Sequence, residues 1–377
     1  MKDGVNLIDI VGYEFYQITF AVAICFIPYM FSKYTIMTIL GYVIWRGLQR
    51  IWSLFMEKTI EISGRGVFIT GCDSGLGFAF ARHFDELGFI VFAGCLNEKG
   101  DGARKLKSDC SKRLHIVEID VTKEESVSSA FQYVKKHTAR KENVCMFYHA
   151  SGLWGIVNNA GINFRGEVEL TTVSLYERTF NINLYGPIRV TKEFLPLIRQ
   201  SKGRVVNITS VHGLMTLPVQ SNYETAKHGV ETLSDSLRLE MKKFGVKVSI
   251  VEPGMYGRCT SVNSSAVVKR HIQEIEEMWE NASELVRNAY SKEYLMSWLP
   301  KPMGTWPPSD DVKPVVSAVE HALVSASPKS RYLVDGVGSK LSFIDEYATL
   351  ARLNNILPTW IIVKCVAVWR NCYRSVT

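Results

Sequence analysis

Residues 70–77 read Thr-Gly-Cys-Asp-Ser-Gly-Leu-Gly, and this stretch decides the fold of the 377-residue chain. The apolar run at residues 67–70 predicts a strand before it, and the pattern from Gly77 to Leu87 predicts a helix after it. Glycine allows the tight turn and close backbone approach that a pyrophosphate needs, and the helix adds free N–H groups and the positive end of its dipole. The stretch therefore predicts a phosphate-binding turn, with an ordinary glycine-rich turn as the alternative.

Short apolar runs alternate with longer amphipathic ones from Gly64 to about Ser330. They predict strands at residues 67–70, 89–94, 114–119, 155–157, 204–208 and 247–251. They predict helices at residues 77–87, 123–136, 173–184, 189–199 and 223–243. Because this alternation implies βαβ units with right-handed crossovers, we expect an α/β fold with a Rossmann-type doubly wound parallel sheet. Such a sheet binds its ligand beyond the carboxyl ends of its strands.

The composition excludes several classes of protein. With 47% hydrophobic and 21% charged residues, the chain is neither disordered nor of low complexity. The net charge is +7 without any block of five like charges, so nothing points to nucleic acid as a partner. The eight cysteines include no Cys-x-x-Cys and no Cys/His zinc spacing, so we expect no metal and a reducing compartment.

The first sixty residues differ from the rest. Residues 15–31 carry no formal charge, and a second apolar run covers residues 34–45. Since a membrane-spanning helix needs about 20 apolar residues, residues 1–60 predict a membrane anchor, either one helix or a hairpin, with a buried core helix as the alternative. The basic residues that follow are Arg46, Arg50 and Lys58. By the positive-inside rule they leave the rest of the chain in the cytosol, as in a protein of the endoplasmic reticulum membrane.

Other compartments and contacts stay open. A mitochondrial membrane is the alternative, although acidic residues stand where a transit peptide carries arginines. A weaker apolar run at residues 356–369 predicts that the tail, residues 336–377, contacts a membrane, the protein itself or a second copy in a homo-oligomer. The globular domain is then expected at residues 61–335.

A tyrosine and a lysine mark a candidate site of proton transfer. Tyr223 and Lys227 lie four residues apart at the start of a predicted helix, which puts them on one face. A phenol with a pKa of about 10 is a poor base, and an ammonium beside it stabilises the phenolate and lowers that pKa. Ser210, thirteen residues before Tyr223, ends a predicted strand and could hold a substrate oxygen. A solvated helix face is the alternative for the tyrosine and lysine alone.

The spacing Gly-x-x-x-Gly-x-Gly, together with these residues, resembles the short-chain dehydrogenase/reductase superfamily over residues 64–254. The resemblance implies hydride transfer between a nicotinamide dinucleotide and an alcohol, with Ser210, Tyr223, Lys227 and Asn183 as catalytic residues. Asn183 would open its helix locally and hold a water that relays the proton from Lys227. The implied cofactor-binding residues are Gly71, Asp73, Ser74, Gly75, Leu76, Gly77, Asp120, Val121, Asn159, Ala160, Gly161, Tyr223, Lys227, Pro253 and Gly254.

The choice of cofactor follows from charge. A 2′-phosphate attracts Arg or Lys near the glycine turn or the end of the second strand. The turn here carries Asp73, and the strand end at residues 94–97 reads Gly-Cys-Leu-Asn, without a cation. We therefore expect NAD in preference to NADP.

Two substrate classes are weighed. Within the superfamily, residues 89–96, 194–199 and 252–254 resemble the branch of retinol, 17β-hydroxysteroid and mitochondrial D-β-hydroxybutyrate dehydrogenases. His212 and Gln220 are the candidate substrate-binding residues, and an uncharged Gln220 suits a carboxylate poorly. We therefore expect a lipophilic alcohol, a retinoid or hydroxysteroid that arrives from the membrane, with D-3-hydroxybutyrate as the alternative. A non-catalytic NAD-binding membrane scaffold is the alternative from another class.

Residues 261–310 are expected to form a helical C-terminal lid over the substrate. Its large side chains suit an apolar ligand and equally a plain helical core. They are Trp279, Tyr290, Tyr294, Met296 and Trp298.

Overall fold

The computed structural model describes residues 19, 22, 29–48, 58–138, 152–254, 256, 257, 260, 265–299, 311–334 and 336. The chain divides into two units, Met1–Lys58 and Thr59–Thr377.

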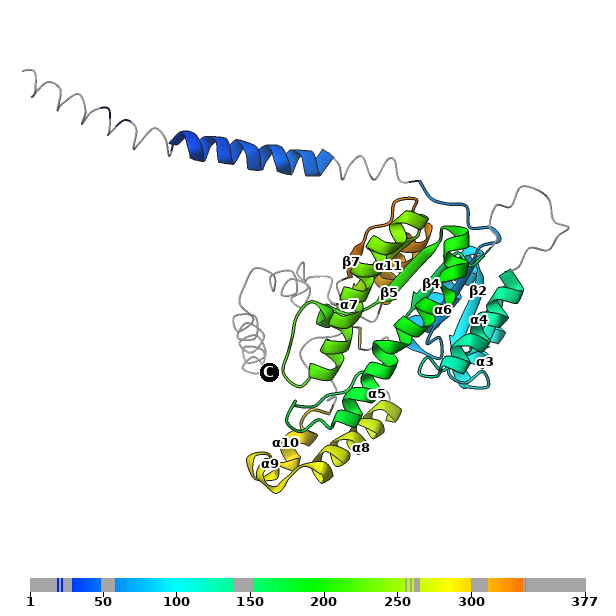
Figure 1. The fold of residues 1–377 in the computed structure, drawn as a ribbon, viewed down its shortest axis with the longest axis vertical. Helices are drawn as coiled ribbons and strands as arrows, with labels where there is room; N and C mark the ends of the chain where they lie inside the picture. Colours follow the sequence, from blue (N-terminus) through cyan, green and yellow to red (C-terminus); the bar gives the residue numbers. More distant parts are fainter. Residues whose placement is uncertain are drawn as a thin grey trace, which may run out of the picture. The chain divides into compact units, whose positions relative to one another are not determined.

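The second unit contains a sheet of seven parallel strands in the order β3-β2-β1-β4-β5-β6-β7 (Figure 1). The strands are β1 (Gly66–Thr70), β2 (Ile90–Cys95), β3 (Leu114–Glu118), β4 (Gly155–Asn158), β5 (Arg204–Ile208), β6 (Lys247–Pro253) and β7 (Arg331–Val334). The winding reverses between β1 and β4, and such a reversal opens a crevice at the carboxyl ends of the strands. The doubly wound parallel sheet expected from the sequence is confirmed.

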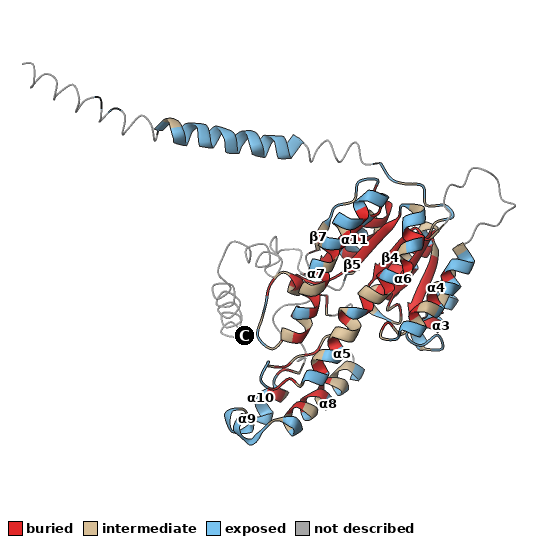
Figure 2. Cartoon of the chain, in the orientation of Figure 1, coloured by how far each residue is buried: buried red, intermediate tan, exposed pale blue. Residues whose placement is uncertain are grey.

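Helices cover both faces of this sheet. They are α2 (Gly75–Leu87), α3 (Asp101–Asp109), α4 (Glu124–Thr138), α5 (Val173–Asn183), α6 (Tyr185–Ser201), α7 (Ser221–Met241) and α11 (Lys313–Val324). The core around Val67 and Ile69 includes α2, α3 and α11, whereas Phe68 belongs to the core of α4, α6 and α7. Neighbouring residues of β1 thus serve opposite faces, as the period of two in a strand requires. Figure 2 shows the resulting buried strands in red.

Three elements of this unit, α3, β7 and α11, were not expected from the sequence. α3 buries only Ala103 and Leu106, so its apolar stripe is weak. β7 has only four residues, which is too short for an alternating pattern to stand out. α11 buries most of its length, including Val315, Val319 and Leu323, so its polar stripe is narrow.

The lid region is helical where it is described. It contains α8 (Ser265–Asn281), α9 (Glu284–Ala289) and α10 (Lys292–Met296), which Figure 1 draws in yellow beside α5. These helices enclose a third apolar core with Phe164, Met278 and Trp298 at its centre. Trp279, Tyr290 and Met296 pack against the same core, so the large lid side chains build a helical core.

The first unit is described mainly at residues 29–48, which are helical and carry almost wholly exposed side chains. Within the described ranges no helix is both long enough and apolar enough to cross a membrane. Most of the expected apolar run at residues 15–31, and all of the run at residues 356–369, lie outside the described residues.

Candidate active site

A cavity of about 650 Å³ lies at the carboxyl ends of the central strands. It brings together nearly all residues that the sequence singled out from separate motifs. Those that line it are Gly71, Asp73, Ser74, Gly75, Leu76, Asp120, Val121, Asn159, Ala160, Gly161, Ser210, His212, Gln220, Tyr223, Lys227, Pro253 and Gly254. Gly77 and Asn183 do not line the cavity but contact residues that do, Gly71 and Ile162 respectively.

The glycine turn follows β1 and needs the absence of side chains. Gly71 has a φ of +72°, and a Cβ there would lie 2.8 Å from the Cα of Ala160. A Cβ on Gly77 would lie 2.1 Å from the carbonyl oxygen of Gly71. Gly77 thus lets the start of α2 press against the turn. This close approach leaves a backbone cradle of the kind that a pyrophosphate occupies.

Asp73 reaches from the turn to the end of β2. Its carboxylate oxygens accept hydrogen bonds from the backbone N–H of Leu96 at 3.0 Å, and one of them from that of Asn97 at 3.4 Å. The acidic group that the strand end itself lacks is therefore supplied by the turn.

A hydroxyl joins β1 to β4 beside the turn. Thr70 Oγ1 accepts hydrogen bonds from the backbone N–H groups of Asn159 and Ala160, each at 3.0 Å. The side-chain amide of Asn159 donates to the carbonyl oxygens of Thr70 and Gly71 at 2.9 and 3.2 Å. The Asn-Asn-Ala-Gly segment thereby holds the glycine turn in place.

Ser210, Tyr223 and Lys227 meet in the same cavity. Ser210 follows β5 and lines the cavity with Tyr223, and its hydroxyl acts to lower the pKa of the phenol. Lys227 lies one turn further along α7, with its Nζ 5.6 Å from the ring centre of Tyr223. The same Nζ donates to the carbonyl oxygen of Ile208 at 3.0 Å.

The pKa values of Tyr223 and Lys227 are dominated by burial. Burial raises the pKa of Tyr223 to about 12; the Ser210 hydroxyl works in the lowering direction, and Glu224 adds to the rise. Burial likewise lowers the pKa of Lys227 to about 8, against the effect of Glu231. Desolvation thus opposes the lowering of the phenol pKa that we expect from Lys227 and from the positive nicotinamide of a bound cofactor.

Asn183 occupies the last position of α5, and only Leu184 separates it from α6. Its side-chain oxygen accepts from the backbone N–H of Ile162 at 2.8 Å, and its amide donates to the carbonyl oxygen of Ile162 at 2.7 Å. The helix does break here, as expected. The side chain also fastens the cavity wall at Ile162 with both polar atoms, and the water that we expected it to hold stays a prediction.

Sequence reasoning missed several polar residues of the site, among them Asn163, Arg165 and Glu224. Arg165 and Asn163 line the cavity, and Arg165 donates to the carbonyl oxygen of Trp298 at 3.0 Å. The buried side-chain oxygens of Asn163 and Gln220 have no hydrogen-bond partner among the described residues. Glu224 pairs with His212. A signal was present, since residues 162–165 continue the Asn-Asn-Ala-Gly segment into the crevice.

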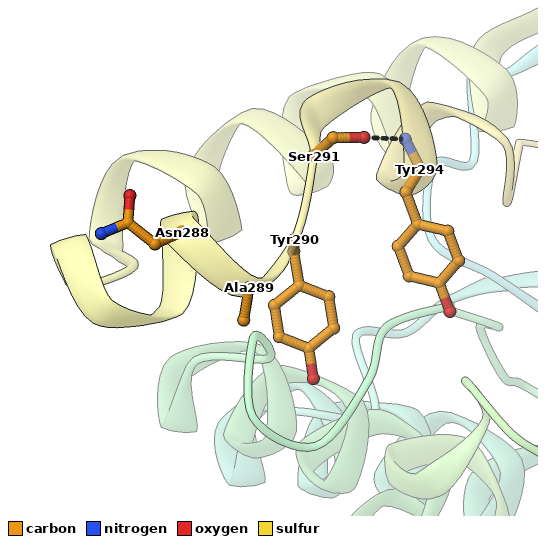
Figure 3. A pocket seen from close by; sticks show the side chains of 5 residues that line it. All are labelled: Asn288, Ala289, Tyr290, Ser291 and Tyr294. Carbon is orange, nitrogen blue, oxygen red and sulfur yellow. Dashed lines mark hydrogen bonds between the residues drawn. The ribbon is translucent and has the colours of Figure 1, made fainter.

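The lid residues contact the site less than expected. None of the five large lid side chains lines the cavity within the described residues. A separate hollow of about 570 Å³ on the lid is formed by Tyr290, Tyr294 and their neighbours (Figure 3). Both phenols donate to Glu167, so these tyrosines fasten the lid to the loop before α5.

Behind the site, one arginine ties α7 to the sheet. Arg331 of β7 donates to Glu252 of β6 and to Asp235 of α7, each at 2.7 Å, and to Glu231 of α7. Burial raises the pKa of Glu252 to about 7, and the charge of Glu231 adds to the rise. The helix that carries Tyr223 is thus anchored by a largely buried ionic cluster.

Comparison with known proteins gives the family. A family model described as short chain dehydrogenase matches residues 65–271. The mitochondrial D-beta-hydroxybutyrate dehydrogenase of Rattus norvegicus is 45% identical over 283 residues, which are 74% of this chain and 79% of the rat protein. Retinol dehydrogenase 16 of Mus musculus is 41% identical over 323 residues, which are 84% of this chain and 96% of the mouse protein.

Solved structures agree with this fold. A short-chain dehydrogenase from Streptomyces avermitilis aligns with a TM-score of 0.57 at 21% identity and covers 84% of this chain and 100% of its own. A short-chain dehydrogenase from Burkholderia cenocepacia, solved with NADP, aligns with a TM-score of 0.55 at 20% identity. The alignment covers 81% of this chain and 98% of the Burkholderia chain. The chain belongs to the short-chain dehydrogenases and is an NAD(P)-dependent oxidoreductase that acts on CH–OH groups.

Proposed function

We propose that Ser210, Tyr223 and Lys227 carry out the proton transfer of an alcohol dehydrogenase whose cofactor is NAD. The observation that carries this proposal is that Ser210, Tyr223 and Lys227 line one cavity, with the Lys227 Nζ 5.6 Å from the ring centre of Tyr223. A substrate hydroxyl between Ser210 and Tyr223 would be held by the serine and would lose its proton to the phenolate form of Tyr223, which the positive charge of Lys227 would stabilise. When bound, the nicotinamide supplies the hydride acceptor and a further positive charge near the phenol.

Asp73 supports NAD as the cofactor. Its carboxylate sits at the end of β2, held by the backbone N–H groups of Leu96 and Asn97. A negative charge fixed there favours a ribose diol, whose hydroxyls can donate to it, and repels a 2′-phosphate. The backbone cradle at Gly71 and Gly77 fits the pyrophosphate of either cofactor.

The first substrate class is a lipophilic alcohol, a retinoid or hydroxysteroid, which the sequence favoured. The retinol dehydrogenase relatives support it. A membrane location would bring such a substrate to the enzyme. The exposed apolar side chains of the helix at residues 29–48 support membrane attachment. The largest are Tyr29, Phe31, Tyr34, Ile36, Met37, Ile39, Leu40, Tyr42, Val43, Ile44, Trp45 and Leu48.

The second class is a short hydroxy acid such as D-3-hydroxybutyrate, and the described wall of the cavity favours it. The sequence argument against it was the missing cation at Gln220. Arg165 now adds a guanidinium to the same wall. A carboxylate binds best to such charged donors. The rat relative named for this substrate supports the same class.

A substrate panel separates these classes. Purified full-length protein with NAD is given D-3-hydroxybutyrate, all-trans-retinol and a 17β-hydroxysteroid, and NADH formation is followed at 340 nm, the absorbance band of NADH. Turnover of the hydroxy acid alone would support the polar wall as the substrate site, whereas turnover of retinol or steroid alone would support the first class. Turnover of none of them would count against both.

The domain arrangement is proposed as in the sequence: an anchor at residues 1–60, a catalytic domain at residues 61–335 and a tail at residues 336–377. The location is proposed as the endoplasmic reticulum membrane with the catalytic domain in the cytosol, and a mitochondrial membrane is the alternative. A variant that begins after Glu57 should stay in the supernatant and still bind NADH. If it still pellets with membranes, attachment lies elsewhere, with residues 356–369 as the next candidate.

A further inference from the structure

Glu224 stands next to Tyr223 on α7, and its carboxylate is almost wholly buried. The side chain is 3% exposed. One oxygen, Oε1, accepts a hydrogen bond from Nδ1 of His212 at 2.8 Å and another from the backbone N–H of Leu217 at 2.9 Å. The carboxylate therefore connects the loop after β5 with the helix that carries the reactive phenol.

This position is costly for the reaction. A buried carboxylate loses its hydration, and this loss needs compensation from a charged or strongly donating partner. Moreover, the charge of Glu224 contributes to raising the pKa of Tyr223, which opposes formation of the phenolate. The ion pair that the structure gives to Glu224 is with His212. The carboxylate of Glu224 therefore acts on the imidazole of His212.

His212 lies close to the two residues that carry the reacting hydroxyl groups, Ser210 and Tyr223. Its backbone N–H donates to Ser210 Oγ at 3.2 Å, and its ring meets the ring of Tyr223 edge-on with centres 6.0 Å apart. The imidazole lines the cavity and is 19% exposed. Because Nδ1 is bonded to Glu224, Nε2 is the ring nitrogen left for a ligand.

We propose that Glu224 is a positioning residue that holds His212 in the Nδ1–H form and turns its Nε2 toward the substrate, where Nε2 accepts a hydrogen bond from a second hydroxyl group beside the reacting alcohol. This deepens the proposed function and rests on it for the identity of the reacting alcohol. Carboxylates orient imidazoles in the same way in catalytic triads and metal sites. The pairing favours a substrate with two oxygen functions over a simple alcohol.

A double-mutant cycle tests the coupling on the full-length protein. Glu224→Gln and His212→Gln should each raise the KM of the accepted substrate by roughly 10- to 100-fold, with a smaller change in kcat. The double variant should be no worse than either single one, because Glu224 acts through His212. His228→Gln is the matched control, since His228 bonds only the backbone oxygen of Glu224 at 2.9 Å, and its KM should stay at the wild-type value. The proposal would be overturned if the KM increases of the two single variants multiplied in the double variant. An unchanged KM in Glu224→Gln would overturn it as well.

A second measurement does not depend on turnover. Nitrogen-15 NMR of histidine-labelled protein reports the tautomer of each imidazole, and His212→Gln identifies the signal of His212. At alkaline pH the signal should show Nδ1–H in the wild type and shift toward Nε2–H in Glu224→Gln, while the Kd for NADH stays unchanged in both. An Nε2–H signal in the wild type would sink the proposal even in an active dehydrogenase. An Nδ1–H signal in a protein that turns over no alcohol would instead refute the proposed function and leave the positioning intact.

Discussion

The two halves of the cavity are built in different ways. The cofactor half is made of backbone: the glycine turn, the start of α2 and the Asn-Asn-Ala-Gly segment, joined by Thr70. The substrate half is made of side chains from three separate segments, with Arg165 before α5, His212 after β5 and Gln220 before α7. A backbone cradle demands particular residues at fixed local spacing, whereas a side-chain wall can be assembled from any segments that the fold brings together.

The largest expected effect is at the junction of the halves. Tyr223→Phe removes the hydroxyl that Ser210 contacts and should lower kcat by about 10³-fold, because no other group is placed to take the proton. The Kd for NADH should change by less than about twofold, since the ring remains. Stopped-flow turnover and NADH fluorescence titration measure the two. Wild-type turnover in this variant would reject the assigned site.

The next effect breaks the cofactor half alone. A Cβ at residue 77 would lie 2.1 Å from the carbonyl oxygen of Gly71, so Gly77→Ala should lower the free energy of unfolding by about 3 kcal/mol and abolish NADH binding. Gly41→Ala is the matched control, because a Cβ there would meet no atom within 4 Å, so the free energy of unfolding should change by less than about 1 kcal/mol. Urea unfolding and NADH titration compare the two. Equal behaviour would show that close approach at the turn is unimportant.

A change confined to the substrate half should leave the cofactor half intact. Arg165→Gln should raise the KM for D-3-hydroxybutyrate by roughly 10- to 100-fold, because a charged donor to the carboxylate is lost. The Kd for NADH should not change. Arg82→Gln serves as the control, since Arg82 forms only an exposed pair with Glu86 on α2. An unaltered KM for the acid in Arg165→Gln would remove the main support for the hydroxy-acid class.

The smallest effect concerns the ionic cluster that supports α7 from behind. The pKa of Glu252 is raised from an ordinary 4.5 to about 7, so the folded state binds this proton more tightly than the unfolded state. The resulting stabilisation is fully present below about pH 4.5 and is lost as the pH rises through 7. Relative to Glu252→Gln, the wild type should therefore lose on the order of 1 kcal/mol across that window. Unfolding free energies at several pH values give the difference, and parallel curves would contradict the assignment.

The sequence predicted the fold closely wherever the hydrophobic period is clear. The strands at residues 67–70 and 204–208, and the helix that follows Gly75, have clear periods and end at glycines or polar residues. β7 and α11 escaped because the first is short and the second is buried around most of its surface. The expected membrane-spanning helix is not found in the described residues, and most of its residues lie outside them.

In the candidate site, contacts within one segment could be predicted from the sequence, and contacts between distant segments could not. Tyr223 and Lys227 were identified because one helical turn brings them together whatever the rest of the chain does. The rise of the Tyr223 pKa through burial could not be predicted, because burial depends on everything that packs around α7. Arg165 and the pairing of Glu224 with His212 were missed because these residues lie on separate segments, which only the folded chain brings to one cavity.

By itself the sequence determined the backbone cradle, the catalytic spacing and the family, since these follow from torsion angles and helical pitch within a few consecutive residues. The tertiary structure alone decided where Asp73 reaches, which charges face the substrate and how Arg331 anchors α7. Those contacts join residues far apart in the chain, and the order of the strands in the sheet controls which of them meet.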